Sequence, residues 1–279
     1  MSKGGFSLSK TLFFRDFPIA KKLLSFGNLS VFILSESKNH NMTKKFIGRK
    51  DEQLTLKKAL ESDEAEMISI IGRRRVGKTF LVRTIYENRI VFEISGLQDA
   101  SGNEQLRNFA NQLKKYSGSK VTIPTPKDWL DAFFRLIEYL ETIDQKEKPV
   151  VFFDEVPWMA THKSGFLKGL SYFWNSWAVK QNIVVVICGS AVSWMIQKIL
   201  RNKGGLHNRV TKRIRLKPFT IPETEEYLIS RNIRLERYQI LQLYMVMGGI
   251  PHYLKEIEGG KSANQNIRKI CFSENGLLK

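Results

Sequence analysis

One eight-residue segment constrains the fold of this chain more than any other. Residues 72–79 are Gly-Arg-Arg-Arg-Val-Gly-Lys-Thr and fit the pattern G-x-x-x-x-G-K-[ST]. An apolar run at 67–71 precedes the segment, and an amphipathic pattern from 78 to about 87 follows it. A strand, a glycine-bounded turn and a helix in this order bring backbone N–H groups and the positive end of a helix dipole to one point. The sequence therefore predicts a phosphate-binding loop in an α/β fold.

Each part of this loop has an expected role in holding a nucleotide. We expect Lys78 to reach the β- and γ-phosphates of ATP and Thr79 to coordinate Mg²⁺. The three arginines either strengthen the positive field at the phosphates or lie in solvent, and a basic surface turn is the alternative for the whole segment. The predicted nucleotide-binding residues of the loop are Gly72, Arg73, Arg74, Arg75, Val76, Gly77, Lys78, Thr79 and Phe80.

Apolar strand patterns alternate with helical patterns from Phe46 onward, which predicts a parallel sheet. Asp128 is a candidate N-cap for one of the helices. After Pro218 the strand pattern stops, and the rest predicts a small helical subdomain with helices near 222–230, 236–247 and 251–258. Strands are expected at 67–71, 90–95, 150–153, 183–188 and, shorter, at 213–216.

Two acidic residues follow the apolar strand expected at 150–153. An aspartate at this point can hold a magnesium ion, directly or through water, so Thr79 and Asp154 are the predicted metal ligands. Glu155 points the other way and can orient the attacking water as a general base. Acidic pairs after strands are common, so the pair alone does not indicate a catalytic site; it does so here because the same chain carries the phosphate loop. Glu155 and Lys78 are therefore predicted catalytic residues.

Ser190 follows the apolar run at 183–188, at the carboxyl end of another expected strand. Ligands bind at this end of the strands in open α/β sheets. Ser190 is therefore a third predicted catalytic residue, which senses the γ-phosphate or its water. An N-cap for a helix at 192–200 is an equal alternative, and both roles can hold together.

Two other phosphate chemistries compete with ATP hydrolysis. A GTPase would carry an Asn-Lys-x-Asp guanine-binding motif, but Asn202-Lys203 continues with two glycines. A small-molecule kinase stays open, although no segment indicates an acceptor pocket.

The formal net charge of +18 predicts attraction to polyanions, with nucleic acid first and a membrane surface second. The excess is uneven, because residues 198–217 include no acidic residue. This stretch predicts a nucleic-acid contact, and a solvated, solubilising face is an equal alternative. Its basic residues are Lys198, Arg201, Lys203, Arg209, Lys212, Arg213, Arg215 and Lys217.

The cysteines and the apolar runs restrict the compartment. Cys188 and Cys271 lie far apart and form no CxxC pair, which favours a reducing, cytoplasmic compartment over a disulfide framework or a zinc site. The longest apolar run, at 183–188, is too short to cross a bilayer, so no membrane partner is expected.

Composition divides the chain into four expected regions. Residues 1–41 are basic, rich in serine and poor in acidic residues; they are either a transit peptide or, as we favour, precede a true start at Met42. Residues 42–217 form the nucleotide-binding domain and 218–260 the helical subdomain. Residues 261–279 are expected to begin a further region that is cut short, with a frayed tail of a stand-alone domain as the alternative.

Four motifs occur in a meaningful order over about residues 44–258. They are Phe46-Ile47-Gly48-Arg49-Lys50-Asp51-Glu52 (hhGRxxE), the phosphate loop, Asp154-Glu155 and Gly249-Ile250-Pro251 (GxP). Together they resemble the bacterial and archaeal ATPases of the STAND division within the AAA superfamily, which are related to origin-recognition initiators.

This resemblance implies a P-loop NTPase fold with a five-stranded parallel sheet of order 5-1-4-3-2 and a helical lid over the nucleotide. It implies that Arg49 and Pro251 enclose the adenine side. Arg209 occupies the zone of the family's arginine finger, although the local pair is Asn208-Arg209 where Gly-Arg is expected, and a surface or DNA-facing residue is the alternative.

Members of this family act as nucleotide-driven switches that often assemble when active. The resemblance thus implies a slow, Mg²⁺-dependent ATP-hydrolysing switch that forms a homo-oligomer with ATP bound. One alternative is a nucleic-acid-binding module with ATP as a slowly hydrolysed structural ligand, and another is a protein-interaction fragment with an inert nucleotide. The acidic pair favours hydrolysis, and the basic stretch keeps the nucleic-acid alternative open.

Overall fold

Five parallel strands form a single sheet in the order β2-β3-β4-β1-β5. The computed structural model describes residues 46–144, 146–201 and 203–278; the predicted leader at 1–41 and the start at Met42 lie outside these residues. The observed order, followed from β5, is 5-1-4-3-2, so the predicted topology is confirmed. The strands are β1 (Glu66–Ile71), β2 (Ile90–Ser95), β3 (Val150–Asp154), β4 (Val184–Gly189) and β5 (Lys212–Arg215).

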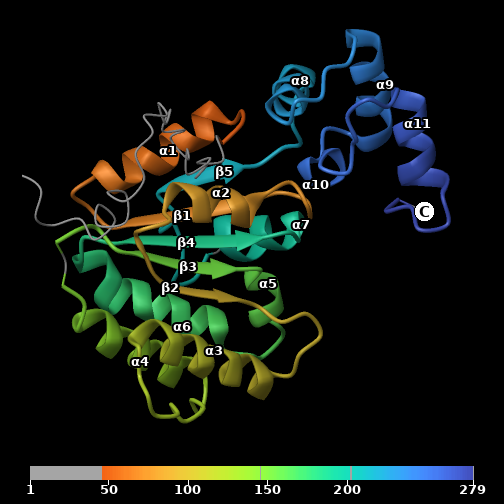
Figure 1. Cartoon of the computed structure of the whole chain (residues 1–279). Helices are drawn as coiled ribbons and strands as arrows, with labels where there is room; N and C mark the ends of the chain where they lie inside the picture. Colours follow the sequence, from red (N-terminus) through yellow and green to blue (C-terminus); the bar gives the residue numbers. More distant parts are fainter. Residues whose placement is uncertain (1–45, 145, 202, 279) are drawn as a thin grey trace, which may run out of the picture. The chain divides into compact units, whose positions relative to one another are not determined.

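Helices cover both faces of the sheet, which explains why β1, β3 and β4 are buried along their whole length. Alternate residues of each strand therefore enter two separate cores. On one face α1 (Lys50–Glu61) and α2 (Lys78–Ile85) pack on Ile70, Phe152 and Val186. On the other face α3 (Gly102–Ser117), α4 (Trp129–Glu141) and α6 (Phe166–Tyr172) pack on Phe153 and Ile187 (Figure 1).

The larger core is built around aromatic rings. The ring of Phe133 lies 5.6 Å from that of Phe153, 5.6 Å from that of Phe166 and 5.5 Å from that of Phe173. The helical segment that supplies two of these rings was not predicted from sequence. It continues from α6 through a π-helical turn (Phe173–Trp177) and a 3₁₀ turn (Ala178–Lys180).

Local sequence signals explain where several helices begin. Asp128 caps α4 as predicted, because its side chain accepts a hydrogen bond from the backbone N–H of Asp131. Ser101 and Glu104 form a capping box at the start of α3. Short helices follow the carboxyl ends of two strands: α5 (Val156–Met159) after β3, and α7 (Val192–Met195) with a π-helical continuation (Ile196–Leu200) after β4.

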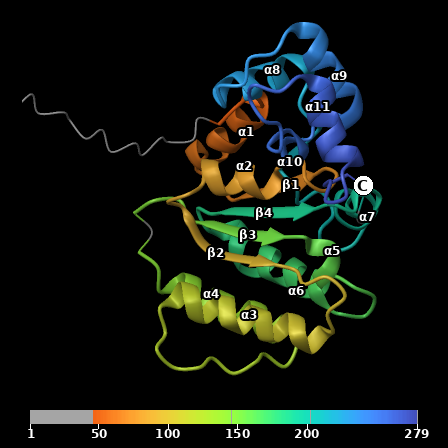
Figure 2. The same ribbon diagram turned by 45° about the vertical axis from the view of Figure 1, so that its right-hand side comes forward.

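The helical subdomain has a core of its own, which includes Phe219, Leu243 and Leu254. Figure 2 shows α8, α9 and α11 as a separate bundle, with α10 on the side toward α2. Ala263 and Ile270 also belong to this core, so the boundary expected at 260 does not separate two cores. The elements are α8 (Ile221–Ser230), α9 (Arg237–Met247), α10 (Pro251–Leu254), α11 (Ala263–Ile267) and a π-helical turn (Arg268–Phe272).

Among the described residues, no helix is both long and apolar enough to span a bilayer.

The aromatic core gives a test with a matched control on the same helix. Phe133→Ala should lower the free energy of unfolding by about 3–5 kcal/mol, because it removes a fully buried ring and leaves a cavity. Phe134 is 43% exposed and touches Tyr172 at the surface, so Phe134→Ala should lower it by about 1 kcal/mol. Urea unfolding followed by circular dichroism measures both values. Equal losses would contradict this assignment of the core.

Candidate active site

The register of three strands brings the predicted site residues together. Ile71 of β1 pairs with Gly189 of β4, and Phe153 of β3 pairs with Ile187 of β4. Because these strands are parallel, their carboxyl ends lie at one edge of the sheet. The phosphate loop, the acidic pair and Ser190 directly follow these ends. Four predicted groups, the loop, Asp154, Glu155 and Ser190, therefore share one site.

Two glycines of the loop are required for different physical reasons. Gly77 precedes α2 with a φ of 94°, a conformation that a side chain disfavours. Gly72 is required by space, because a Cβ there would lie 2.4 Å from the carbonyl oxygen of Leu216 just after β5. The start of the loop, at Gly72, thus packs on the residue that follows the edge strand β5, and the loop ends at Gly77, where α2 begins.

Lys78 is a buried cation at the start of α2, with 5% of the residue exposed. Its Nζ donates hydrogen bonds to the carbonyl oxygens of Gly72, at 2.9 Å, and Arg73, at 3.3 Å. The Oε1 atom of Glu155 lies 3.8 Å from the same Nζ. The ammonium group is therefore held inside the loop by carbonyls and faces one carboxylate.

Thr79 and Asp154 form the second part of the site. The Thr79 hydroxyl donates to Oδ2 of Asp154 at 2.6 Å, and the backbone N–H of Glu155 donates to Oδ1 at 3.0 Å. Burial raises the pKa of Asp154, against the hydrogen bond from Thr79. A hydroxyl and a carboxylate side by side are hard oxygen ligands of the kind that Mg²⁺ prefers. The two side chains therefore fit the predicted metal site.

Glu155 is fixed by Ser190 rather than left free. Its Oε2 accepts hydrogen bonds from the backbone N–H of Ser190, at 3.0 Å, and from the Ser190 hydroxyl, at 2.8 Å. Glu155 has a left-handed backbone (φ 47°), which turns it away from Asp154 as α5 begins. The carboxylate therefore lies between Ser190 and Lys78.

The alternative role of Ser190 as an N-cap is wrong. Helix α7 begins after Ala191 and has no side-chain cap. The Ser190 hydroxyl is directed instead to Glu155, which lies 35 residues earlier in the chain. Its role as a phosphate sensor stays a prediction.

Two exposed arginines of the loop contact aromatic rings. The guanidinium of Arg74 lies 5.0 Å from the Trp158 ring, and that of Arg75 lies 5.6 Å from the Tyr253 ring. Such cation–π contacts hold the arginine side chains at the rim of the loop. Arg73 is exposed, and Val76 is buried in the smaller core. Phe80 is 52% exposed.

Two of the rings around this loop, those of Trp158 and Tyr253, were not predicted as site residues. Phe46 stacks on Phe80 with ring centroids 5.5 Å apart, and Trp158 and Tyr253 come from α5 and α10. Phe46 opens the hhGRxxE motif, so its position was signalled in the sequence. Trp158 and Tyr253 carry no signal, because only the folded chain brings them to the loop.

Arg49 and Pro251 lie where the helical subdomain meets the loop. Arg49 is buried and donates through Nη2 to the carbonyl oxygen of Val76 at 2.6 Å. Pro251 is the first residue of α10, two residues before the Tyr253 ring that meets Arg75. Their predicted contact with adenine stays a prediction.

Arg209 lies away from this site. The backbone N–H of Thr211 donates to Met67, and Lys212 pairs with Ile68, so Arg209 precedes β5 near the start of β1. The phosphate loop follows the other end of β1. Arg209 is exposed and is not brought to the phosphate loop of its own chain.

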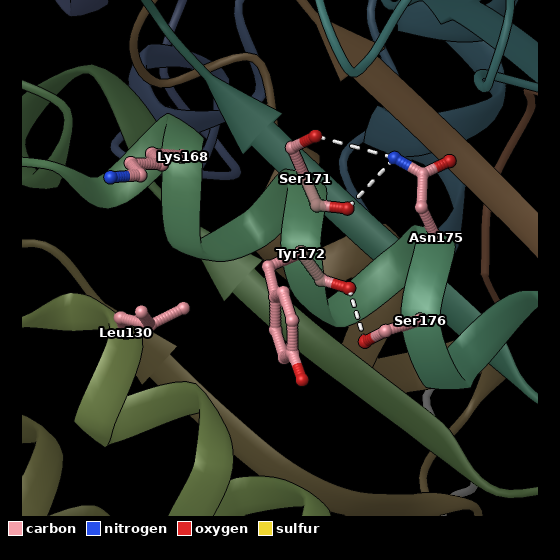
Figure 3. A pocket seen from close by; sticks show the side chains of 6 residues that line it. All are labelled: Leu130, Lys168, Ser171, Tyr172, Asn175 and Ser176. Atoms are coloured by element: carbon pink, nitrogen blue, oxygen red, sulfur yellow. Dashed lines mark hydrogen bonds between the residues drawn. The ribbon is translucent and has the colours of Figure 1, made fainter.

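A pocket of about 490 Å³ lies elsewhere, between α4 and the segment from α6 to its π-helical turn (Figure 3). Asn175 lines this pocket, and its side-chain amide donates a hydrogen bond to the carbonyl oxygen of Ser171 at 2.8 Å. None of the predicted site residues lines this pocket, which is formed by Leu130, Lys168, Ser171, Tyr172, Asn175 and Ser176.

Two archaeal relatives from Methanocaldococcus jannaschii share moderate identity with the chain. One, an uncharacterised protein, is 27% identical over 215 residues, which cover 76% of this chain and 44% of that protein. The other, an uncharacterised ATP-binding protein, is 26% identical over 270 residues, which cover 81% of this chain and 74% of that protein. The chain thus spans under half the length of the first relative.

Two solved structures and one family model are similar to this chain in fold or sequence. A Walker-type ATPase of Pyrococcus abyssi superposes with a TM-score of 0.55 at 18% identity, over 76% of this chain and 66% of that one. Cdc6p from Pyrobaculum aerophilum gives 0.52 at 16% identity, over 76% and 60%. Both support a P-loop ATPase fold. The model of an ATPase domain predominantly from Archaea matches residues 46–257, and the chain therefore belongs to this family of archaeal ATPase domains.

Proposed function

We propose that this domain is an ATP-hydrolysing molecular switch of the STAND division of the AAA superfamily. The observation that carries the proposal is the position of Glu155, whose carboxylate is held by Ser190 and faces Lys78 at 3.8 Å. A carboxylate fixed beside a phosphate-binding lysine is suited to general-base catalysis on a nucleotide. The order of the hhGRxxE, acidic-pair and GxP motifs supports the STAND assignment.

Binding of ATP would exchange the partners of Lys78. Its ammonium group now contacts the carbonyl oxygens of Gly72 and Arg73. Phosphate oxygens are stronger acceptors because they are charged. Backbone N–H groups at the start of α2 add further donors, and the helix dipole favours the negative charge.

Thr79 and Asp154 would hold Mg²⁺ through the hydroxyl and the carboxylate that lie 2.6 Å apart. Bound there, Mg²⁺ would neutralise charge on the phosphates. The burial that raises the pKa of Asp154 would be offset by a neighbouring cation.

Hydrolysis needs a base for the attacking water. The water oxygen forms a bond to the γ-phosphorus, the bond to the β,γ-bridging oxygen breaks, and ADP and inorganic phosphate leave. Glu155 accepts the proton of the water, while Ser190 keeps the carboxylate in place through two donors. Lys78 stabilises charge on the phosphate oxygens.

The wider context of the switch follows from the same proposal. The residues of the sheet and its helices, up to 217, would bind the nucleotide, and the helical subdomain that begins at 218 would act as the lid. Arg209 is exposed near the start of β1, away from the phosphate loop of its own chain. As an arginine finger it would therefore reach the nucleotide bound by a second copy of the chain in an ATP-bound homo-oligomer. Sedimentation with and without ATP tests whether such an oligomer forms. The free cysteines Cys188 and Cys271 support a cytoplasmic location.

A second function, binding of a nucleic-acid backbone, is favoured by the structure of β5. Ile214 and Leu216 are buried, so Arg213 and Arg215 project from the opposite, exposed side of this edge strand, and Lys217 is exposed two residues beyond its end. Alternate residues of a strand lie about 6.7 Å apart, so the cations form a straight row. Such a row matches a chain of phosphates.

Two further observations refine this candidate surface. Lys212 points away from the row, and its Nζ lies 3.3 Å from Oε1 of the buried Glu66. Among the described residues between 180 and 220, no large apolar side chain is exposed. Anionic lipid surfaces also attract basic residues, and it is the even spacing of the cations along an extended strand that favours a nucleic-acid backbone.

The role of Lys78 is tested by binding. Lys78→Ala should weaken binding of Mg²⁺–ATP about 10- to 100-fold, because hydrogen bonds to charged groups contribute about 1.5–3 kcal/mol. Lys57→Ala removes an exposed lysine of α1 and should leave the affinity unchanged. Isothermal titration calorimetry measures both. Equal affinities would exclude the phosphate-loop assignment.

The role of Glu155 is tested by turnover. Glu155→Gln should keep the affinity for ATP but lower phosphate release about 10²- to 10⁴-fold, because the amide cannot accept the proton. Glu138→Gln, which changes an exposed residue of α4, should hydrolyse ATP normally. If the unaltered chain and Glu155→Gln are equally slow, the catalytic role is wrong, and the switch would run on nucleotide exchange.

The basic row is tested by the salt dependence of DNA binding. Replacing Arg213, Arg215 and Lys217 by Gln should reduce the slope of log K against log salt by about 2–3, because up to three phosphate contacts are lost. A matched variant with Lys115, Lys120 and Lys127 replaced by Gln changes the net charge equally on the α3–α4 side. Fluorescence anisotropy with labelled duplex and single-stranded DNA measures the slopes. If both triple variants give equal slopes, the basic row does not contact DNA and is a solvated, solubilising face.

A further inference from the structure

The helical subdomain is connected to the phosphate loop through Arg49. Arg49 precedes α1 and is 6% exposed. Its Nη2 donates to the carbonyl oxygen of Val76 inside the phosphate loop at 2.6 Å. Its guanidinium carbon lies 4.9 Å from the ring centroid of Phe219, which belongs to the core of the subdomain. One side chain therefore contacts both parts.

Glu223 completes this connection from the side of the subdomain. Its Oε1 accepts a hydrogen bond from the backbone N–H of Arg49 at 2.8 Å. Its Oε2 accepts hydrogen bonds from the backbone N–H and the hydroxyl of Thr220, at 2.8 and 2.9 Å. One oxygen thus closes the capping box of α8, and the other binds a residue 174 positions away in the chain.

Gly48 allows this approach. It has a φ of 65°, and a Cβ there would lie 2.5 Å from Oε1 of Glu223 and 2.9 Å from its Cγ and Cδ. Any side chain at position 48 would therefore displace the glutamate. The side chain of Gln53 also holds this turn, because its Nε2 donates to the carbonyl oxygen of Gly48 at 2.7 Å.

We propose that Arg49 and Glu223 form a latch between the helical subdomain and the phosphate loop, and that this latch controls how fast bound nucleotide leaves. The two are positioning residues, because they act through Val76 and α8. A subdomain that swings away must break the Glu223–Arg49 bond. The effect on nucleotide release rests on the proposed function, since it requires nucleotide at the loop.

The capping box supplies a matched control for this latch. Thr220→Ala removes the cap of α8 but leaves Oε1 of Glu223 free to bind Arg49. Glu223→Ala removes the reciprocal half of the capping box, in which Oε2 accepts from Thr220, together with the latch, while the Thr220 hydroxyl can still accept from the backbone N–H of residue 223. Both variants should lose stability to a similar degree, about 2–4 °C in Tm. A purely structural role would therefore affect the two variants alike.

Release of the fluorescent nucleotide mant-ADP separates the two roles. In stopped-flow displacement by excess ADP, Glu223→Ala should release mant-ADP about tenfold faster than the unaltered chain, because a charged hydrogen bond is lost. Thr220→Ala and Glu226→Ala, an exposed position of α8, should stay within about twofold. Glu223→Gln should be intermediate, because its amide oxygen can still accept from Arg49. Equal release from Thr220→Ala and Glu223→Ala would overturn the proposal.

A nucleotide-free measurement separates failure of the latch from failure of the proposed function. In amide hydrogen exchange, a peptide covering residues 46–53 should exchange faster in Glu223→Ala but not in Thr220→Ala, because the N–H of Arg49 loses its acceptor. If exchange is unchanged, the contact is absent and the latch is wrong. If the unaltered chain binds no mant-ADP, both the proposed function and the control of nucleotide release are wrong. Amide hydrogen exchange in the two variants still decides whether Glu223 binds the backbone N–H of Arg49.

Discussion

Parallel pairing of β1, β3 and β4 decides where chemistry can take place in this chain. The three strands are buried on both faces, so a shift in register would move each side chain into the opposite core, whose packing is fitted to other side chains. Their alignment brings the residues that follow each strand to one edge. Lys78, Asp154, Glu155 and Ser190 are then within reach of one another although they span more than 110 positions in the sequence. The helices on both faces serve this alignment by completing the two cores.

Buried charge is the main energetic difficulty of such a site. Lys78 and Asp154 are each 5% exposed, and an ion removed from water must be compensated by hydrogen bonds or by opposite charge. The chain compensates with its own groups, since Lys78 binds carbonyls of the loop and Asp154 accepts from Thr79. The groups that would bind phosphate and metal are thus held in position by uncharged partners, which a charged ligand can replace. Preorganisation of this kind limits the reorganisation needed when a ligand binds.

The sequence was sufficient for those parts of the structure that depend on local patterns. The strands, the phosphate loop and the cap at Asp128 follow from apolar runs, glycine spacing and N-cap chemistry. The strand order came from family resemblance, because periodicity alone carries no order. The contacts of Ser190 and Glu223 could not be predicted, since their partners lie 35 and 174 residues away. For Glu223, the capping-box pattern from Thr220 was visible in the sequence, but it explains only one of the two carboxylate oxygens.

The short link between β5 and α8 has a mechanical consequence. The backbone N–H of Leu216 donates to Ile71 in the sheet, and that of Phe219 donates to Gly249 in the helical subdomain, both at 2.8 Å. Only Lys217 and Pro218 lie between these two anchor points, and proline fixes one of the backbone angles. Three residue steps span at most about 11 Å, so this end of the subdomain cannot be carried far from the sheet. A rotation of the subdomain about 217–218 would therefore displace the far end of the bundle most, whereas Leu216 would keep its place against Gly72, the first glycine of the phosphate loop.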